Sequence, residues 1–211
     1  MDFGDAFGMD VRVTKEVDHN GKPARMVTGS RLYNTDAEDL WDALTNPERV
    51  PRWFLPVSGD LKVGGRYQLE GFAGGDITRC DEARALDVTW EVGDNVSWLQ
   101  VRLTPEAGGA RLTLDHIMLK DEQGEAHWKT YGPGATGVGW ELSFLAFGYH
   151  LSHDGIQIDP GAYQEWTISD AGKAFSRNSA EAWGDAHIAS GEDEQIALGM
   201  AEATAKFYSG E

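Results

Sequence analysis

Apolar and polar residues alternate along much of the first half of the chain, and this period of two predicts β-strands. Residues 9–33 form a predicted hairpin, in which "DVRVTKEV" runs out, "DHNGKP" turns and "ARMVTGSRLY" returns. From residue 60 the alternation resumes through Leu61, Val63, Tyr67 and Leu69. Turns at 73–76, 93–95 and 105–110 then separate further strands that end near Met118. The pattern therefore predicts an antiparallel sheet with hairpin connections.

Between these two groups of strands the period becomes that of a helix. Thr35 and Glu38 form a predicted capping box at its start. Asn46-Pro47 predicts a second short helix, which Pro51 and Pro56 prevent from running far. The helical spacing of the first is carried by Ala37, Leu40, Trp41 and Leu44, so we expect Trp41 to pack in the core.

After the strands, the chain becomes glycine-rich and then helical. Residues 127–137, "HWKTYGPGATG", predict a loop, and we interpret "GPGATGVG" at 132–139 as a flexible lid. Residues 138–151, "VGWELSFLAFGYHL", carry the broad apolar stripe of a helix that lies on a sheet. Residues 152–168 are expected to form a loop, and helices are predicted at 170–189 and 192–208. The last has an apolar line of Ile196, Met200, Ala203 and Phe207.

Composition excludes several classes of partner. With 35 acidic and 18 basic residues the net charge is −17, which repels phosphate backbones and anionic lipid surfaces, so we expect no nucleic acid and no membrane partner. No apolar run approaches the ~20 residues of a membrane span, and the N-terminus "MDFGDAFGMD" lacks the basic region of a signal peptide. The single cysteine, Cys80, fits a cytoplasmic location, and we expect it to be packed in a strand rather than reactive.

Four phrases, in order, resemble the SRPBCC or START-like superfamily: "DLWDALTNPERVPRWF", "GDLKVGGRYQL", "VTW" and "ARLTLDH". They are most similar to its branch named after the activator of the heat-shock chaperone ATPase, over about residues 25–151. The resemblance implies an α+β helix-grip fold, with a curved antiparallel sheet wrapped around a long C-terminal helix and a cavity between them. We expect a helix-grip domain with an extra N-terminal hairpin over residues 1–151, and a helical extension over residues 152–211.

The resemblance and the aromatic content together suggest residues that line such a cavity. Trp53 and Phe54 lie where a short helix meets a proline-bounded loop, and there they serve either as core or as pocket rim. The full set of predicted ligand-binding residues is Trp53, Phe54, Tyr67, Trp90, His116, Trp140, Phe144 and Phe147.

Candidate chemistry is sparse. His116 lies on the inward face with Leu112 and Leu114, as either a satisfied core histidine or a ligand-orienting or acid–base group. Glu141 and Asp76 could each reach a cavity mouth as a general acid or base. No spacing pairs either of them with a nucleophile, so we assign no catalytic residue.

Three residues that can bind a metal lie at the end of the 138–151 helix. His150, His153 and Asp154 offer two imidazoles and a carboxylate, but no further motif completes four ligands. Exposed polar residues at a helix end are the ordinary interpretation, and we predict no metal and no cofactor.

Three functions stay open on the sequence. The first is a binding module for a small hydrophobic or aromatic molecule, held between sheet and helix. The second is an enzyme similar to the polyketide cyclases and aromatases of the superfamily. The third is a chaperone cofactor or protein-interaction module, including a homodimer formed through the C-terminal helices.

Overall fold

The computed structural model describes residue 3 and residues 11–211. Within this part the chain forms eight β-strands and six α-helices, with one short 3-10 helix, and the class is α+β as predicted. The prediction about a signal peptide concerns residues 1–10, which apart from Phe3 lie outside the described residues.

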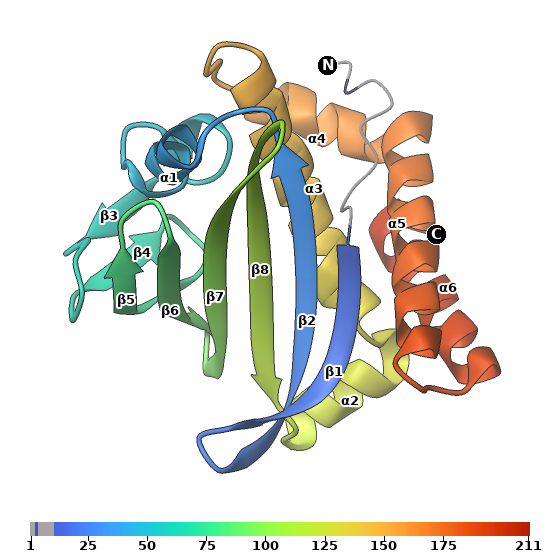
Figure 1. Cartoon of the computed structure of the whole chain (residues 1–211). Coiled ribbons are helices and arrows are strands. Elements are labelled where there is room, and N and C mark those ends of the chain that lie inside the picture. The colour runs from blue at the N-terminus through green and yellow to red at the C-terminus, as the bar shows by residue number, and fades with distance from the viewer. Residues whose placement is uncertain (1–2, 4–10) are drawn as a thin grey trace. The chain divides into compact units, whose positions relative to one another are not determined.

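The strands belong to one sheet in the order β1-β2-β8-β7-β6-β5-β4-β3 (Figure 1). From β8 to β3 each neighbouring pair is antiparallel, as hairpin connections require. The strands are β1 (Val11–His19), β2 (Lys22–Tyr33), β3 (Val57–Gly59), β4 (Arg66–Leu69), β5 (Gly74–Asp81), β6 (Ala85–Val92), β7 (Asn95–Glu106) and β8 (Gly109–Leu119).

The helices separate into two short ones before β3 and a group after β8. They are α1 (Ala37–Thr45), η1 (Val50–Arg52), α2 (Glu122–Tyr131), α3 (Gly134–Ser152), α4 (Pro160–Ile168), α5 (Asp170–Ala189) and α6 (Glu194–Ser209). Strands, two small helices, antiparallel strands and then a long helix is the helix-grip order, so this prediction is confirmed. None of the described helices combines the length and the apolar character that crossing a bilayer demands.

The chain divides into two compact units. One contains residues 1–29, 119–145 and 158–211, and the other contains residues 30–118 and 146–157. We call them the helical unit and the sheet unit. The division proposed from the sequence, with a boundary at residue 151, stays a prediction.

The predicted N-terminal hairpin is present. Its turn is Asn20-Gly21, with φ of 54° and 78°, and the backbone N–H of Gly21 donates to Asp18 Oδ1 at 2.8 Å. Two successive residues with positive φ are the signature of the tight turn that Asn-Gly favours.

The first helix begins one residue later than the capping box indicated. Asp36 is its N-cap and accepts from the backbone N–H of Asp39, whereas Thr35 donates its hydroxyl to the Asp39 carboxylate at 2.8 Å. The buried face consists of Ala37, Leu40 and Ala43, and Trp41 is only half-buried, so the prediction that Trp41 packs in the core was too strong.

The prediction of a strand from residue 60 was wrong in its position. Leu61 and Val63 lie outside any strand and are exposed, because β3 ends at Gly59 and β4 begins at Arg66. The next turn covers residues 70–73 rather than 73–76. Gly74 and Gly75 belong to β5, where they pair with Gln68 and Tyr67 of β4. Gly75 is required there, since a Cβ would lie 2.1 Å from the Thr89 carbonyl oxygen. Cys80 is exposed on β5, so the prediction of a packed cysteine was wrong.

The predicted loop over 127–137, and with it the lid at 132–139, is also wrong, because both ranges are mostly helical. Asp121 caps α2 by accepting from Gly124 N, and α2 continues to Tyr131. Gly132, with φ 57°, and Pro133 then make a sharp break before α3 begins at Gly134. Likewise the expected loop over 152–168 contains α4, which Asp159 caps and Pro160 begins.

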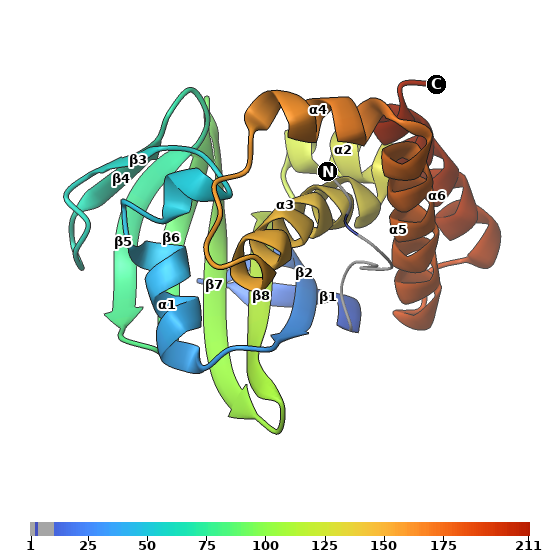
Figure 2. The same cartoon turned by 90° about the horizontal axis from the view of Figure 1, so that it is seen from above.

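The last two helices are confirmed nearly as predicted, and they lie side by side in Figure 2. Their contact is close, because a Cβ at Gly184 would lie 2.9 Å from the Ala201 Cβ. The buried residues of α6 are therefore small: Ala197, Ala201, Thr204 and Ser209. The predicted apolar line was wrong in phase, and Ile196 and Phe207 point to solvent.

Candidate ligand-binding site

A row of aromatic rings extends through the sheet unit from its surface to its interior. Phe54 and Trp53 are half-buried and stacked, with ring centroids 5.4 Å apart. Trp53 in turn contacts Phe147 on α3 at 4.5 Å, and Phe147 contacts Tyr33 at the end of β2 at 5.2 Å. Phe147 and Tyr33 are buried. We call these four residues the aromatic row.

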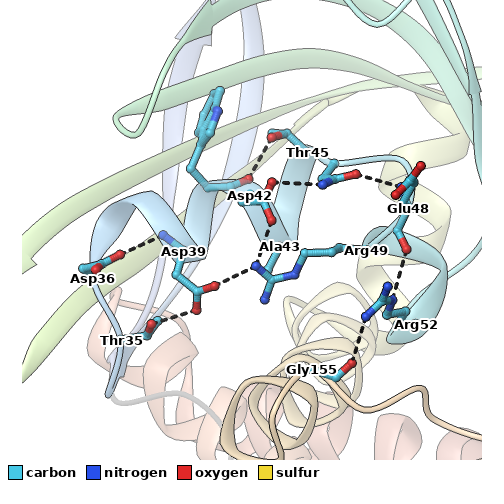
Figure 3. A network of polar contacts seen from close by, with 12 residues as sticks. Thr35, Asp36, Asp39, Asp42, Ala43, Thr45, Glu48, Arg49, Arg52 and Gly155 are labelled. Carbon is cyan, nitrogen blue, oxygen red and sulfur yellow. Dashed lines mark hydrogen bonds and ion pairs between the residues drawn. The ribbon is translucent and has the colours of Figure 1, made fainter.

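A polar network fixes the outer end of the row (Figure 3). Arg49 donates to Asp39 at 2.6 Å and to Asp42 at 2.9 Å, and so holds the segment after α1 against the helix. Hydrogen bonds from Arg49 keep the pKa of both carboxyls below its usual value; at Asp39 burial, the largest influence, opposes this by raising the pKa.

Trp53 is held by a hydrogen bond of its own. Its Nε1–H donates to the carbonyl oxygen of Ala43 on α1 at 2.9 Å. Arg52, next in the chain, donates to the carbonyl oxygens of Glu48 at 3.2 Å and Gly155 at 3.4 Å (Figure 3). The indole is therefore positioned by α1, and the preceding residue is linked to the loop that follows α3, while the Trp53 ring stays partly open to solvent.

A second aromatic group lies toward the β3 edge of the sheet. Tyr67 on β4 is buried and donates its hydroxyl to the Thr89 carbonyl at 2.8 Å, and burial raises the pKa of this phenol. Trp90 lies between Tyr67, at 6.5 Å, and Phe72, at 5.7 Å between ring centroids. Phe72 is exposed, so this group too reaches the surface.

His116 is buried among the strands, as its face predicted. Its Nε2 lies 2.8 Å from Ser97 Oγ, and Ser97 donates its one hydroxyl hydrogen to the Trp90 carbonyl at 3.1 Å. Nε2 must therefore carry a hydrogen and donate to Ser97. Burial lowers the pKa of His116 to about 4, so the ring is neutral at physiological pH. These contacts satisfy Nε2 within the protein, as expected for a core histidine.

Trp140 and Phe144 lie on α3 in the helical unit. Their ring centroids are 6.3 Å apart, and Phe144 is buried whereas Trp140 is half-buried. The predicted lining residues thus fall into three groups: the aromatic row with Trp53, Phe54 and Phe147, the edge group with Tyr67, Trp90 and His116, and this pair on α3. Their role as a ligand site stays a prediction.

Glu141 does not reach a cavity mouth. It is fully buried, Arg12 pairs with both of its oxygens, and Trp183 Nε1 donates to Oε1 at 2.8 Å. Its hydrogen-bonding capacity is committed to the interior of the helical unit. Asp76 pairs with Arg66 on the exposed surface of β4 and β5 at 2.8 Å. Neither carboxylate is placed as a general acid or base.

His150 is buried rather than exposed at the helix end. Its Nδ1 lies 2.8 Å from the Ile156 carbonyl, so Nδ1 carries the hydrogen and Nε2 has no partner among the described residues. Burial lowers the pKa of His150. His153 instead stacks on Tyr149 at the surface, at 4.0 Å. In the described part of the chain no cluster of three metal-ligating side chains is found.

Tyr33 and Arg31 were missed by the sequence reasoning. Both follow the alternation of β2 and lie on one face of the strand, and the Arg31 guanidinium is 5.6 Å from the Tyr33 ring centroid. The alternation of the predicted strand could have indicated Tyr33, whereas no local pattern distinguishes Arg31.

The comparisons with known proteins agree with this architecture. The most informative solved structures are those of CalU16 from Micromonospora echinospora, which is 28% identical to this chain. The solution structure covers 88% of this chain and 99% of CalU16 with a TM-score of 0.70, and the crystal structure covers 83% and 96% with a TM-score of 0.63.

A more distant structure shares the fold alone. MLL2253 from Mesorhizobium loti is 22% identical, with 61% of this chain and 97% of MLL2253 covered and a TM-score of 0.53. No curated protein matches. Residues 34–147, more than half of the chain, match the family described as "Activator of Hsp90 ATPase homolog 1-like protein". The chain therefore belongs to the Activator of Hsp90 ATPase homolog 1-like family.

Proposed function

We propose that this protein binds a small hydrophobic or aromatic molecule against the aromatic row. The observation that carries the proposal is the stack of Trp53 and Phe54, which stays half-exposed while it contacts the fully buried Phe147. Apolar ligand surface removed from water at such a site contributes about 25 cal/mol per Å². A rim of this kind, leading to a buried aromatic interior, supports binding of a flat apolar guest.

Fluorescence titration with the neutral probe N-phenyl-1-naphthylamine tests the proposal. We expect saturable binding, and we expect Trp53→Ala to weaken it about tenfold or more, because the ring that links surface and interior is lost. Trp41→Ala is the matched control, since Trp41 is another half-buried tryptophan on α1 outside the row. Equal affinity in all three proteins would remove the row from the site.

Native mass spectrometry of the freshly purified protein addresses the natural ligand. An added mass that disappears in the Trp53→Ala protein would support the site and give the ligand's size. His116→Ala and Trp140→Ala extend the test to the other predicted lining residues. Should neither substitution change the affinity for the ligand so found, those residues leave the lining set.

Binding is favoured over the cyclase-like alternative by the carboxylates. Glu141 is paired within the helical unit and Asp76 on the surface, so the two carboxylates considered from the sequence as general acid or base are engaged in ion pairs. Turnover of polyketide-like substrates that was abolished by His116→Ala would reverse this preference. A cytoplasmic location is part of the proposal and rests on the single cysteine.

A protein-interaction role is favoured by one surface. On α6, Phe207 is 62% exposed, and Ile196, three helical turns earlier on the same side of the helix, is exposed as well. Large apolar side chains left in water on one helix favour an interface, and a homodimer is the predicted form. We expect light scattering to give a dimer for the wild type and a monomer for Phe207→Glu. Gln195→Glu, which adds the same charge at an exposed position of α6, should leave the dimer intact, and a monomeric wild type would exclude it.

A further inference from the structure

Arg31 differs from the other partly buried arginines of the described chain. Arginines with mostly covered side chains each pair with a carboxylate: Arg12 with Glu141, Arg25 with Glu125, Arg49 with Asp39 and Asp42, Arg102 with Asp87 and Arg111 with Glu106. Arg31 has no carboxylate among the described residues, and its buried Nη1 has no hydrogen-bond partner there. This is notable in a chain with 35 acidic and 18 basic residues.

The guanidinium lies at the inner end of the aromatic row. Its Cζ is 5.6 Å from the centroid of the Tyr33 ring. Above it, α3 presents Gly148, where a Cβ would be 3.9 Å from Arg31 Cζ and 3.4 Å from Tyr33 Cε1. The row therefore runs from half-exposed Phe54, through three rings in contact, to a cation with an unused donor.

Such a residue weakens the fold unless something else compensates. Arg31 is half-buried, and its Nη1 is enclosed. An enclosed donor without an acceptor loses hydration that no protein group replaces, and an apolar side chain of similar length would avoid this cost. Tyr33 offers a cation–π contact, which replaces only part of the lost hydration. A buried donor left unused in a native protein calls for an explanation, and a ligand that supplies the acceptor is one.

We propose that Arg31 binds an acidic oxygen of the ligand, such as a carboxylate or phenolate, while the ligand's ring system lies against the aromatic row. The inference rests on the proposed function and narrows it to aromatic or apolar acids. The planar fork of a guanidinium matches a carboxylate in a way that a point charge does not. Arg31 would also allow a strongly acidic protein to bind an acidic ligand, because no described carboxylate neutralises its charge.

Two probes with the same apolar body provide the test. 8-Anilino-1-naphthalenesulfonate carries an anionic group, and N-phenyl-1-naphthylamine is the same ring system without it. We expect the wild type to bind the anionic probe more tightly than the neutral one. Arg31→Met should lower the affinity for the anionic probe by about 10- to 100-fold, the range for a hydrogen bond to a charged group. The affinity for the neutral probe should change by less than about twofold.

Two further variants separate charge from geometry. Arg31→Lys keeps the charge and loses the fork, so its affinity for the anionic probe should fall between those of the wild type and Arg31→Met. Arg79→Met is the control, because it removes the same charge from an exposed position on β5. It should leave both affinities unchanged.

Thermal unfolding without probe separates a binding residue from a structural one. Arg31→Met should melt at the same temperature as the wild type or higher, since it removes a half-buried cation with an enclosed donor that has no acceptor. A clear fall in melting temperature with equal losses for both probes would make Arg31 structural and overturn the inference. Neutral-probe binding with no preference for the anion, unaffected by Arg31→Met, would overturn it but leave the proposed function standing. If neither probe binds the wild type, both fail.

Discussion

Arg12 on β1 and Glu141 on α3 pair through two parallel hydrogen bonds, Nε to Oε1 at 2.6 Å and Nη2 to Oε2 at 2.9 Å. Trp183 from α5 donates to the same carboxylate at 2.8 Å. Three elements of the helical unit, distant in sequence, thus meet at one fully buried carboxylate. A bidentate geometry of this kind is the strong form of an ion pair.

We predict that Glu141→Gln lowers the free energy of unfolding by about 3–5 kcal/mol. The amide nitrogen of glutamine faces a guanidinium donor, and Arg12, whose side chain is largely covered, loses the bidentate carboxylate with which it pairs in the wild type. Urea denaturation followed by circular dichroism measures the change. Glu181→Gln, at an exposed position of α5, is the control and should stay within about 0.5 kcal/mol of the wild type. A loss as small as the control's would mean that the pair contributes little.

His116 gives the protein a predicted sensitivity to acid. Burial lowers its pKa from 6.5 to about 4, so between these values the unfolded chain binds a proton that the folded one does not. The contribution of the neutral His116 ring to the free energy of unfolding is therefore complete above pH 6.5 and is lost as the pH falls toward 4. The full loss amounts to about 3 kcal/mol.

The expected result is a stability curve that falls between pH 6.5 and 4 and falls less steeply in His116→Gln. Glutamine keeps a donor for Ser97 and cannot take up the proton. Unfolding free energies measured across this pH range test the difference in slope. His127→Gln, a change at an exposed histidine, should follow the wild type. Parallel curves for wild type and His116→Gln would show that this ring does not drive the loss.

Most of the fold could be predicted from the alternation of residues in the strands and from the residues that favour turns. The hairpin at Asn20-Gly21, the face that buries His116, and the last two helices all follow from patterns within a few residues, and all were predicted. Predictions failed where distant packing decides. Gly74 and Gly75 suggest a turn locally, but both pair with β4 within β5, and the missing side chain of Gly75 admits the Thr89 backbone from β6.

Only part of the candidate site could be predicted from the sequence. Trp53 and Phe54 stood out because two prolines flank them, and the structure does bring them to Phe147. Arg31 was missed because its significance is the lack of a carboxylate partner, which no local pattern encodes. Glu141 was misassigned for the converse reason, since its partner Arg12 is 129 residues away.

Trp53→Phe separates the indole hydrogen bond from the ring contact. Phenylalanine keeps an aromatic ring beside Phe147 but cannot donate to the Ala43 carbonyl. We expect a stability loss of about 1 kcal/mol, typical of one hydrogen bond, with neutral-probe affinity reduced far less than in Trp53→Ala. Denaturant unfolding and probe titration on the same samples provide both values. Equal loss of affinity in the two variants would assign binding to the indole N–H rather than to the apolar ring.

Two helical glycines provide opposite predictions from the same substitution. At Gly137 on α3, a Cβ would lie 2.1 Å from Cε2 of the buried Trp183, so Gly137→Ala must displace that indole and its hydrogen bond to Glu141. We expect a loss of several kcal/mol, as for overpacking of a rigid core with a broken buried polar contact. At Gly199 on α6 a Cβ meets nothing within 4 Å, and Gly199→Ala should stabilise the protein by up to about 1 kcal/mol through helix propensity. Melting temperatures of the two variants should therefore move in opposite directions. If Gly137→Ala melted at the same temperature as the wild type, that result would contradict the close approach of α5 to α3 that brings Trp183 to Glu141.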